Sequence, residues 1–256
     1  MKKNILNYKN LMLVILSTIC FVSNSVAQVN SVNISTSTEF CGTETKNFSL
    51  TLGGTAIGNL TYTWSTSGDG TFSAPNGSST NYTPGVGDLS NGSFSLTVAV
   101  DDDGDASHTV SSPATMSVFD LPQINAISND GAQCEGVAIH LNATTSAGDG
   151  IITSYTWTGA NSFSASSEDA TISNPSNAND GVYTLTITDA NGCSVNSSTT
   201  VTVYKKPSIA AISNDGPKCE GLNIALNATT ADGDAAITTY AWTGSNSFTA
   251  NTEDAT

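Results

Sequence analysis

The first residues that could do chemistry are a run of carboxylates at residues 101–105, DDDGD. Alternating carboxylates of this kind are similar to the start of a calcium-binding loop, which draws oxygen ligands from every second position. An EF-hand loop also needs a glycine at its sixth position and a glutamate at its twelfth, and neither is present here. Because acidic residues also gather in solvated turns, the sequence predicts an acidic turn between two strands and no metal site. Calcium binding by Asp101, Asp103 and Asp105 is the alternative.

The two histidines of the chain, His108 and His140, do not form a catalytic pattern. The alternation of residues 137–141 places His140 on the solvent side of a strand, and the residue 85 positions further on is Ala225. Neither a G-x-S-x-G nor an H-E-x-x-H motif occurs. Acidic pairs such as Glu168-Asp169 are expected in solvated turns rather than in buried positions that raise a carboxyl pKa. The sequence therefore predicts no catalytic residue, no cofactor and a protein that is not an enzyme.

The sequence repeats with a period of 85 residues, which matches a whole small domain rather than the unit of a solenoid. SNDGAQCEG at residues 128–136 recurs as SNDGPKCEG at residues 213–221. The segment before Pro122 is a more distant copy. Further pairs that align under this shift are Pro122 and Pro207, Cys134 and Cys219, Leu141 and Leu226, Trp157 and Trp242, and SEDAT (167–171) and TEDAT (252–256).

Each copy has the pattern of short antiparallel strands. In VYTLTIT (182–188), the side chains of Tyr183, Leu185 and Ile187 alternate with threonines, as in a half-buried strand. Roughly seven such strands per copy predict an all-β fold of tandem β-sandwiches. Three tryptophans each follow a tyrosine by two residues and so share its inward face, which predicts core positions rather than an exposed sugar-binding platform. They are Trp64, Trp157 and Trp242.

The N-terminus and the charge limit where the protein acts and what it binds. Residues 1–27 combine lysines, an apolar run too short to span a bilayer and the small-residue site SVA, which together predict a secretory signal peptide. Removing it takes three of seven lysines and leaves four against 22 acidic residues, a net charge of −18. Such a chain is a poor ligand for nucleic acid or anionic membranes. We expect a secreted or cell-surface protein with no membrane insertion of the mature chain.

The joints between copies define the predicted domains. VFDLPQI (118–124) and VYKKPSI (203–209) each run one copy into the next with only a few residues and a proline between them, as in a semi-rigid spacer. The sequence therefore predicts an elongated array. Its parts are a signal peptide (1–27), two complete sandwiches (28–120 and 121–205) and an incomplete third repeat (206–256).

Residues 154–193 resemble the bacterial immunoglobulin-like repeats of secreted Bacteroidetes surface proteins, on the motifs YTW at 155–157 and NDGVY at 179–183. Residues 61–84 resemble the related PKD-like variant. The resemblance implies that the tryptophan fills the core and that Tyr183 forms a tyrosine corner. It also implies a role as a spacer, an adhesive array or an appendage of a secreted enzyme.

The pairing of the cysteines is predicted from the oxidising compartment and from this resemblance. Leu185 stands where an antibody domain has its second core cysteine, so the bridge is expected at Cys193, joined to Cys134 of the same domain. Cys41 lacks a partner in its own domain and is expected to be buried and inert, with intermolecular pairing as the alternative. Cys219 is expected to be unpaired.

Two functions fit these observations. The first is a non-catalytic extracellular repeat protein that acts in cell-surface adhesion or as a structural spacer, and that binds another surface or extracellular protein or a glycan. The second is an accessory segment, a spacer or a carbohydrate-binding module, of a larger secreted enzyme.

Overall fold

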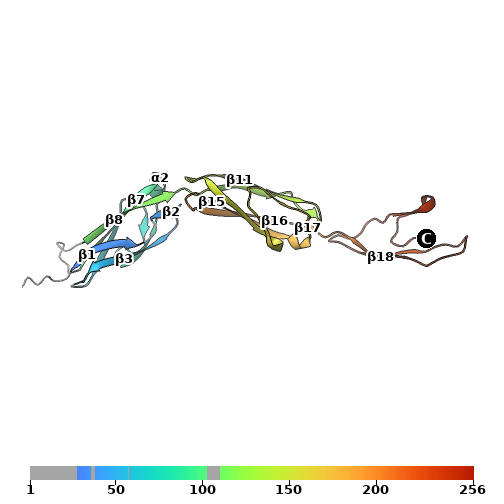
Figure 1. Cartoon of the computed structure of the whole chain (residues 1–256), viewed down its shortest axis with the longest axis horizontal. Helices are drawn as coiled ribbons and strands as arrows, with labels where there is room; N and C mark the ends of the chain where they lie inside the picture. Colours follow the sequence, from blue (N-terminus) through green and yellow to red (C-terminus); the bar gives the residue numbers. More distant parts are fainter. Residues whose placement is uncertain (1–27, 36–37, 57, 103–109) are drawn as a thin grey trace, which may run out of the picture. The chain divides into compact units, whose positions relative to one another are not determined.

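The structure, a computed structural model, describes residues 28–35, 38–56, 58–102 and 110–256 (Figure 1). The predicted signal peptide (1–27), Asp103, Asp105 and His108 lie outside these residues. The chain divides into two compact units, Met1–Ser117 and Val118–Thr256. Among the described residues no helix is long and apolar enough to cross a membrane.

The first unit consists of two four-stranded sheets and one short helix, α2 (Val86–Asn91). One sheet has the order β1-β3-β6-β5 and the other β2-β8-β7-β4. The register of β7 keeps Phe94, Leu96 and Val98 buried, since alternate side chains of a strand face the same side. The strands are β1 (Val29–Ser35), β2 (Glu39–Cys41), β3 (Lys46–Gly54), β4 (Thr61–Thr66), β5 (Thr71–Phe72), β6 (Ser79–Thr83), β7 (Ser93–Asp101) and β8 (Val110–Phe119).

The core of the first unit is aromatic. Trp64, at 4% exposure, packs against Phe48 and Phe72, and its Nε1 donates to the carbonyl of Gly77 at 3.0 Å. The ring of Tyr82 is buried against those of Phe72 and Phe94. Contacts of this kind add to the free energy of burial and place the two sheets face to face.

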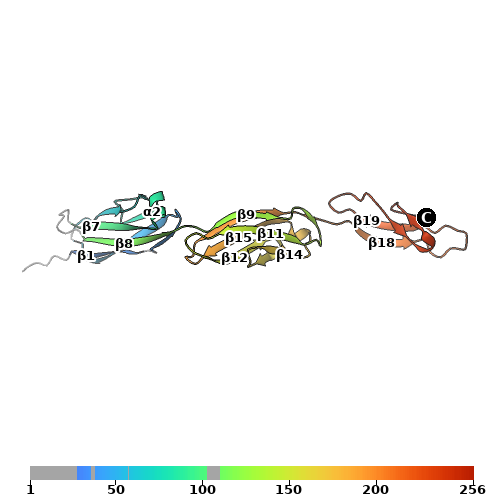
Figure 2. The same ribbon diagram turned by 90° about the horizontal axis from the view of Figure 1, so that it is seen from above.

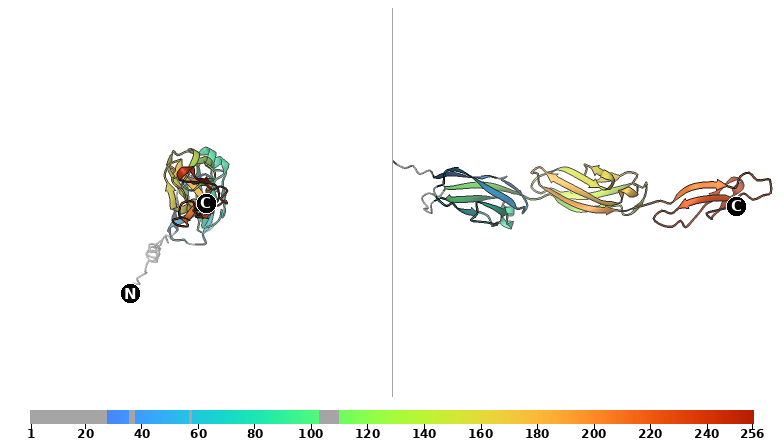
Figure 3. Two further views of the ribbon diagram at one scale, coloured as in Figure 1. Left: turned by 90° about the vertical axis from the view of Figure 1, so that its right-hand side faces the viewer. Right: turned by 90° about the horizontal axis from the view of Figure 1, so that it is seen from below.

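The second unit begins with a complete sandwich (Figures 2 and 3). A three-stranded sheet, β14-β11-β9, faces a four-stranded sheet, β13-β12-β15-β16, while β10 and β17 form a short parallel pair. The strands are β9 (Gln123–Asn129), β10 (Gln133–Cys134), β11 (Ile139–Ser146), β12 (Ile152–Gly159), β13 (Phe163–Ala165), β14 (Ala170–Ile172), β15 (Gly181–Asp189), β16 (Ser194–Val201) and β17 (Val203–Tyr204), with 3-10 turns η2 (Ala160–Ser162) and η3 (Asn177–Asn179).

A tryptophan and a tyrosine anchor this sandwich. Trp157 of β12 and Tyr183 of β15 are both fully buried, together with Leu185 and Ile187. The Tyr183 hydroxyl donates to the carbonyl of Asn179 at 2.9 Å, four residues upstream. This hydrogen bond ties the start of β15 to the turn before it, as a tyrosine corner does.

Residues 207–256 repeat the first half of that sandwich. β18 (Ser208–Asn214) pairs with β19 (Leu226–Ala231) in antiparallel register, side by side in Figure 2. β20 (Trp242–Thr243) pairs with β21 (Thr249–Ala250), and the 3-10 turn η4 (Ser245–Ser247) lies between the two strands. Trp242 is partly exposed here, unlike Trp64 and Trp157, and so departs from the predicted core position.

The described chain is thus an all-β array of immunoglobulin-like sandwiches, and the fold class predicted from the sequence is confirmed. One strand prediction fails in part: Ile139 and Leu141 are buried, but Val137 on the same predicted face is 45% exposed. The reason is that β11 begins only at Ile139, so Val137 lies in the preceding turn, where alternation does not apply.

The tyrosine corner gives a stability prediction. Tyr183→Phe keeps the buried ring but leaves the Asn179 carbonyl without its donor, so we expect a loss of about 1–3 kcal/mol in the free energy of unfolding. Urea titration followed by tryptophan fluorescence measures it. Val182→Ala, at a side chain that is 57% exposed, is the matched control and should have a much smaller effect. Equal losses in the two variants would contradict the role given to the hydroxyl.

Candidate functional sites

The predicted Cys134–Cys193 bridge is wrong. Cys134 has a free, exposed thiol, whereas Cys193 is buried and disulfide-bonded. Cys134 lies beside Tyr204 in the parallel pair of β10 and β17, and Cys193 lies in the turn before β16. The eight residues of β16 separate these two ends of the sandwich. At about 3.3 Å per residue this is on the order of 25 Å, far beyond the roughly 7 Å between Cα atoms that a disulfide spans.

The expectation for Cys41 is also wrong, because Cys41 is disulfide-bonded. Cys219 has an exposed free thiol, as predicted. Asp189 holds the turn that presents Cys193: its Oδ1 accepts from the backbone N–H of Cys193 at 2.8 Å and of Asn191 at 2.9 Å. Sequence spacing could place Cys193 in a turn but could not show which end of the sandwich that turn occupies.

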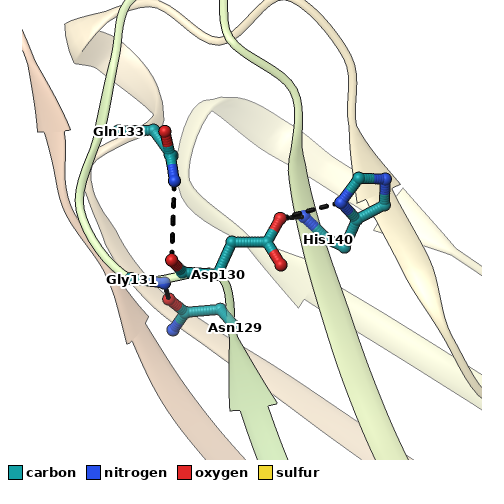
Figure 4. Close-up of polar contacts among 5 residues, drawn as sticks. All are labelled: Asn129, Asp130, Gly131, Gln133 and His140. Carbon is teal, nitrogen blue, oxygen red and sulfur yellow. Dashed lines mark hydrogen bonds and ion pairs between the residues drawn. The ribbon is translucent and has the colours of Figure 1, made fainter.

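The aspartate of the repeated motif SNDG, Asp130, contacts His140 in the second unit (Figure 4). The side chain of Asn129 accepts from the N–H of Gly131 at 2.8 Å, closing a turn in which Gly131 has a φ of 81° that favours glycine. Asp130 Oδ2 lies 2.7 Å from both the backbone nitrogen and the ring Nδ1 of His140. These hydrogen bonds to His140, the backbone bond above all, lower the pKa of Asp130.

The third repeat shows which of these contacts the motif requires. The side chain of Asn214 accepts from Gly216 N–H at 2.8 Å, and Asp215 accepts from the backbone of Ala225 at 3.1 Å. Since Ala225 has no ring, the shared task of the aspartate is to hold a backbone N–H near the start of the next strand: that of His140, the second residue of β11, and that of Ala225, the residue before β19. The imidazole of His140 is an exposed addition to a structural turn, with 59% of its side chain accessible. An Asp–His pair of this kind is no catalytic dyad without a positioned nucleophile or substrate pocket.

The acidic pair Glu168-Asp169 lies in a bend, where Asp169 is exposed and Glu168 is half-buried, and from there it also holds a strand. Asp169 Oδ1 accepts from Ala143 N–H at 2.9 Å, and Glu168 Oε1 accepts from the N–H and the hydroxyl of Thr145 at 2.9 and 2.7 Å. These carboxylates are occupied by backbone donors of β11 rather than poised for proton transfer. In the third repeat, Asp254 Oδ1 accepts from the N–H of Ala228, and Glu253 Oε1 accepts from the hydroxyl of Thr230.

Another repeated aspartate fastens the residue two positions before the proline of each joint, and sequence reasoning missed it. Asp120 N–H donates to the Asp149 carboxylate at 2.7 Å, and Asp149 N–H returns a bond to the Asp120 carbonyl at 3.3 Å. Lys205 and Asp234 exchange the same two bonds at 2.7 and 3.2 Å. A Cβ on the preceding glycine, Gly148, would lie 2.1 Å from the Asp120 carbonyl oxygen. The Gly-Asp pair at 148–149 and 233–234 is the sequence signal that could have revealed this clamp.

The first unit holds its own buried polar cluster. The Tyr82 hydroxyl donates to Asp88 Oδ2 at 2.7 Å and accepts from Gly70 N–H at 3.1 Å. Burial raises the pKa of Tyr82 to about 12, so its phenol stays protonated at neutral pH. Asp69 accepts from the N–H groups of Gly87 and Asp88, and these bonds lower its pKa. The cluster joins the 66–70 loop to α2 and has the character of a structural network.

The described residues offer no group of three or more acidic, histidine or cysteine side chains that could hold a metal ion. Asp102 is fully buried and its Oδ2 accepts from Val29 N–H at 3.0 Å. Its neighbours Asp103 and Asp105 lie outside the described part of the chain, so the calcium alternative is not tested.

Comparison with known proteins adds only structural likeness. No model of a protein family matches the sequence, and no curated protein matches it. Similar solved structures include three N-terminal domains of the outer capsid protein Hoc of bacteriophage RB49 (16% identity, 88% of this chain and 80% of that one, TM-score 0.33). Another similar structure is that of titin domains I67–I69 (15% identity, 86% of this chain and 81% of that one, TM-score 0.38). A third is that of the eight N-terminal immunoglobulin domains of DSCAM (14% identity, 86% of this chain and 35% of that one, TM-score 0.38).

The cysteine assignment predicts the pattern of thiol labelling. In the mature, unreduced protein, iodoacetamide should modify Cys134 and Cys219 but not Cys41 or Cys193, because only the first two have exposed free thiols. Peptide mapping by mass spectrometry measures this. Reduction before labelling should bring all four peptides to full modification. A disulfide-linked peptide that contains Cys134 would contradict the assignment.

The carboxylate bonds predict a loss of stability in acid. The folded pKa values of Asp130, Asp69 and Glu135 are lowered by backbone N–H donors, so the unfolded chain binds protons more readily. Their contribution is present above the ordinary carboxyl pKa of about 4 and is lost as pH falls through the lowered values. We expect a melting temperature that is steady from neutral pH to about pH 5 and falls below about pH 4.

Asp130→Asn should weaken this acid dependence, since the amide cannot take up the proton. Glu220→Gln, at an exposed residue, removes the same charge and serves as the control. A melting temperature that rises between about pH 5 and pH 3 would contradict the sign of the effect.

Proposed function

We propose that this chain is a non-catalytic extracellular repeat protein, secreted or held on the outer cell surface, that acts in adhesion or as a structural spacer. The observation that carries the proposal is the use of its repeated acidic residues. Asp130, Asp169 and Asp149 bind backbone donors, and their counterparts in the third repeat, which are Asp215, Asp254 and Asp234, do the same. Residues repeated in this way maintain a scaffold rather than a reaction centre.

The compartment and lineage are supported from the sequence. The signal-like residues 1–27 point to export, and disulfide bonds at Cys41 and Cys193 fit an oxidising space. The resemblance of residues 154–193 and 61–84 supports a place among Bacteroidetes-type immunoglobulin-like and PKD-like repeats. The domain boundaries at 28–120, 121–205 and 206–256 are part of this proposal.

The partner we propose is a surface or extracellular protein or a glycan rather than a polyanion, because the mature chain has four lysines against 22 acidic residues. Trp64 and Trp157 are buried and donate their indole N–H groups to backbone carbonyls. They cannot serve as a sugar-stacking platform, so a glycan contact on the two complete sandwiches must use the polar outer faces of the strands. This weighs against the alternative of a carbohydrate-binding segment that works through tryptophan.

Protein and glycan arrays probed with the mature chain (28–256) test the proposal. We expect saturable binding to a protein or neutral glycan and none to heparin, because a net charge of −18 repels a polyanion. His140→Ala, a change at an exposed side chain, is the control for catalysis and should leave binding unchanged. Turnover of an array ligand that His140→Ala abolishes would overturn the assignment as a non-enzyme.

A further inference from the structure

A buried carboxylate in the first unit has one oxygen without a partner. Asp102 follows the last residue of β7 and is fully buried. Its Oδ2 accepts from the N–H of Val29 at 3.0 Å, while its Oδ1 contacts no hydrogen-bond donor among the described residues. Taking an ionised carboxylate out of water is costly unless an opposite charge or further donors face it. Asp102 Oδ1 therefore needs one more donor, and a cation suits it best.

The described side chains of the first unit do not supply that cation. Lys46 is the one lysine, arginine or histidine among residues 28–35, 38–56, 58–102 and 110–117. Its Nζ forms an ion pair with Glu44 at 2.9 Å and also donates to the carbonyl of Glu39. A positive charge for Asp102 must therefore come from another kind of group.

The predicted mature N-terminus lies next to this carboxylate. The peptide group between Gln28 and Val29 is held on both sides. Its N–H donates to Asp102, and its carbonyl oxygen lies so close to Gly54 that a Cβ there would be 2.0 Å away. Because a peptide group is planar, only rotation about the Cα–C bond of Gln28 decides where the Gln28 nitrogen lies. Three covalent bonds separate that nitrogen from the Val29 nitrogen, so the two atoms are roughly 3 Å apart.

We propose that removal of residues 1–27 places the new α-ammonium group of Gln28 on Asp102 Oδ1, so that cleavage completes the polar core of the first unit. Hydrolysis of the Ala27–Gln28 bond by a signal peptidase leaves the carboxylate on Ala27 and the amine on Gln28. With a pKa of roughly 8, this α-amino group is cationic at neutral pH, whereas the amide before cleavage carries no charge. The carboxylate then accepts from two consecutive nitrogens, Oδ2 from Val29 and Oδ1 from Gln28.

The pairing has a chemical consequence for Gln28. An N-terminal glutamine cyclises when its neutral α-amine attacks the side-chain carbonyl carbon, which forms a lactam C–N bond and releases ammonia. A carboxylate beside the α-amino group favours the protonated form, and the ammonium has no free electron pair for this attack. The folded protein should therefore keep an open Gln28. This inference rests on the export proposed above, because the charge exists only after cleavage.

The experiment compares chains that begin at Gln28 with chains that keep Ala27, each with Asp102 or with Asp102→Asn. Hydrogen exchange at residues 94–100 of β7 reports the opening of the first unit. With Asp102, exchange should be at least about ten-fold faster when Ala27 is kept, because the Gln28 nitrogen is then an uncharged amide. With Asp102→Asn, the two chains should differ by less than about two-fold, since the charge to be paired is gone. EDTA in the buffer prevents a divalent cation from replacing the ammonium.

A control and a second readout accompany this comparison. His108→Gln removes the other basic side chain of residues 28–117 and should leave the effect of Ala27 unchanged. Cyclisation of Gln28, followed by mass spectrometry as the loss of ammonia, should be at least about ten-fold slower in the folded chain than in a free peptide of residues 28–35. Asp102→Asn should make it faster in the folded chain.

N-terminal sequencing of the protein after secretion of the full chain (1–256) by a bacterium tests the export separately. A first residue other than Gln28 would show that the cleavage site, and with it the pairing, is misassigned. A protein that begins at Gln28 but responds to Ala27 equally with Asp102 and with Asp102→Asn would overturn the pairing alone. So would cyclisation in the folded chain that is as fast as in the free peptide.

Discussion

A backbone N–H group at the end of a short strand needs an acceptor, and in this protein side-chain carboxylates repeatedly provide it. Asp130, Asp169 and Asp149 each hold a backbone donor that the sheets themselves do not pair. These bonds tie the turn at 128–131 and the bend at 167–169 to β11, and they fasten Asp120 to the turn at 148–149. The sandwiches, the turns and the joints all depend on this one type of contact.

This use of carboxylates explains a composition that looks suited to metal binding or acid–base chemistry. Many of the acidic side chains lie in turns and near strand ends and accept from backbone N–H groups, as those of Asp130, Asp149 and Asp189 do. A carboxylate that accepts backbone hydrogen bonds is held ionised, which is the opposite of the raised pKa that a general acid requires. The most strongly shifted phenol, that of Tyr82, is buried and bonded to Asp88, so it too stabilises structure rather than taking part in chemistry.

Within the described residues, the second and third repeats can be compared as one sequence pattern with the covering strands β15 and β16 and without counterparts of them. The local contacts survive in both: the Asn-Gly turn, the aspartate bond to the next strand and the indole N–H bond to a backbone carbonyl. What changes is burial, since Ile139 is fully covered and Ile224 is not. Local hydrogen bonds therefore shape the half-sandwich, but the core needs side chains from β15 and β16.

Much of the fold could be predicted from the sequence because its signals are local. Period-two alternation predicted the strand of 182–188, whose inward side chains Tyr183, Leu185 and Ile187 are buried, and the 85-residue repeat indicated separate domains. Tyr183 bonds to a carbonyl only four residues away, so a short motif was enough to indicate it. The backbone partners of Asp149 and Glu168 lie 29 and 23 residues away along the chain, so a short motif could not predict them.

The cysteines show most clearly what only the tertiary structure decided. The sequence by itself determined an acidic, all-β chain with Cys193 in a turn, since charge, strand period and turn residues are all readable along the chain. It could not determine that Cys134 and Cys193 lie at opposite ends of one sandwich, because chain separation does not report distance through space once strands run back and forth. The course of the strands through space decides which cysteines can form a disulfide and which backbone groups a carboxylate can reach. That course exists only in the folded protein.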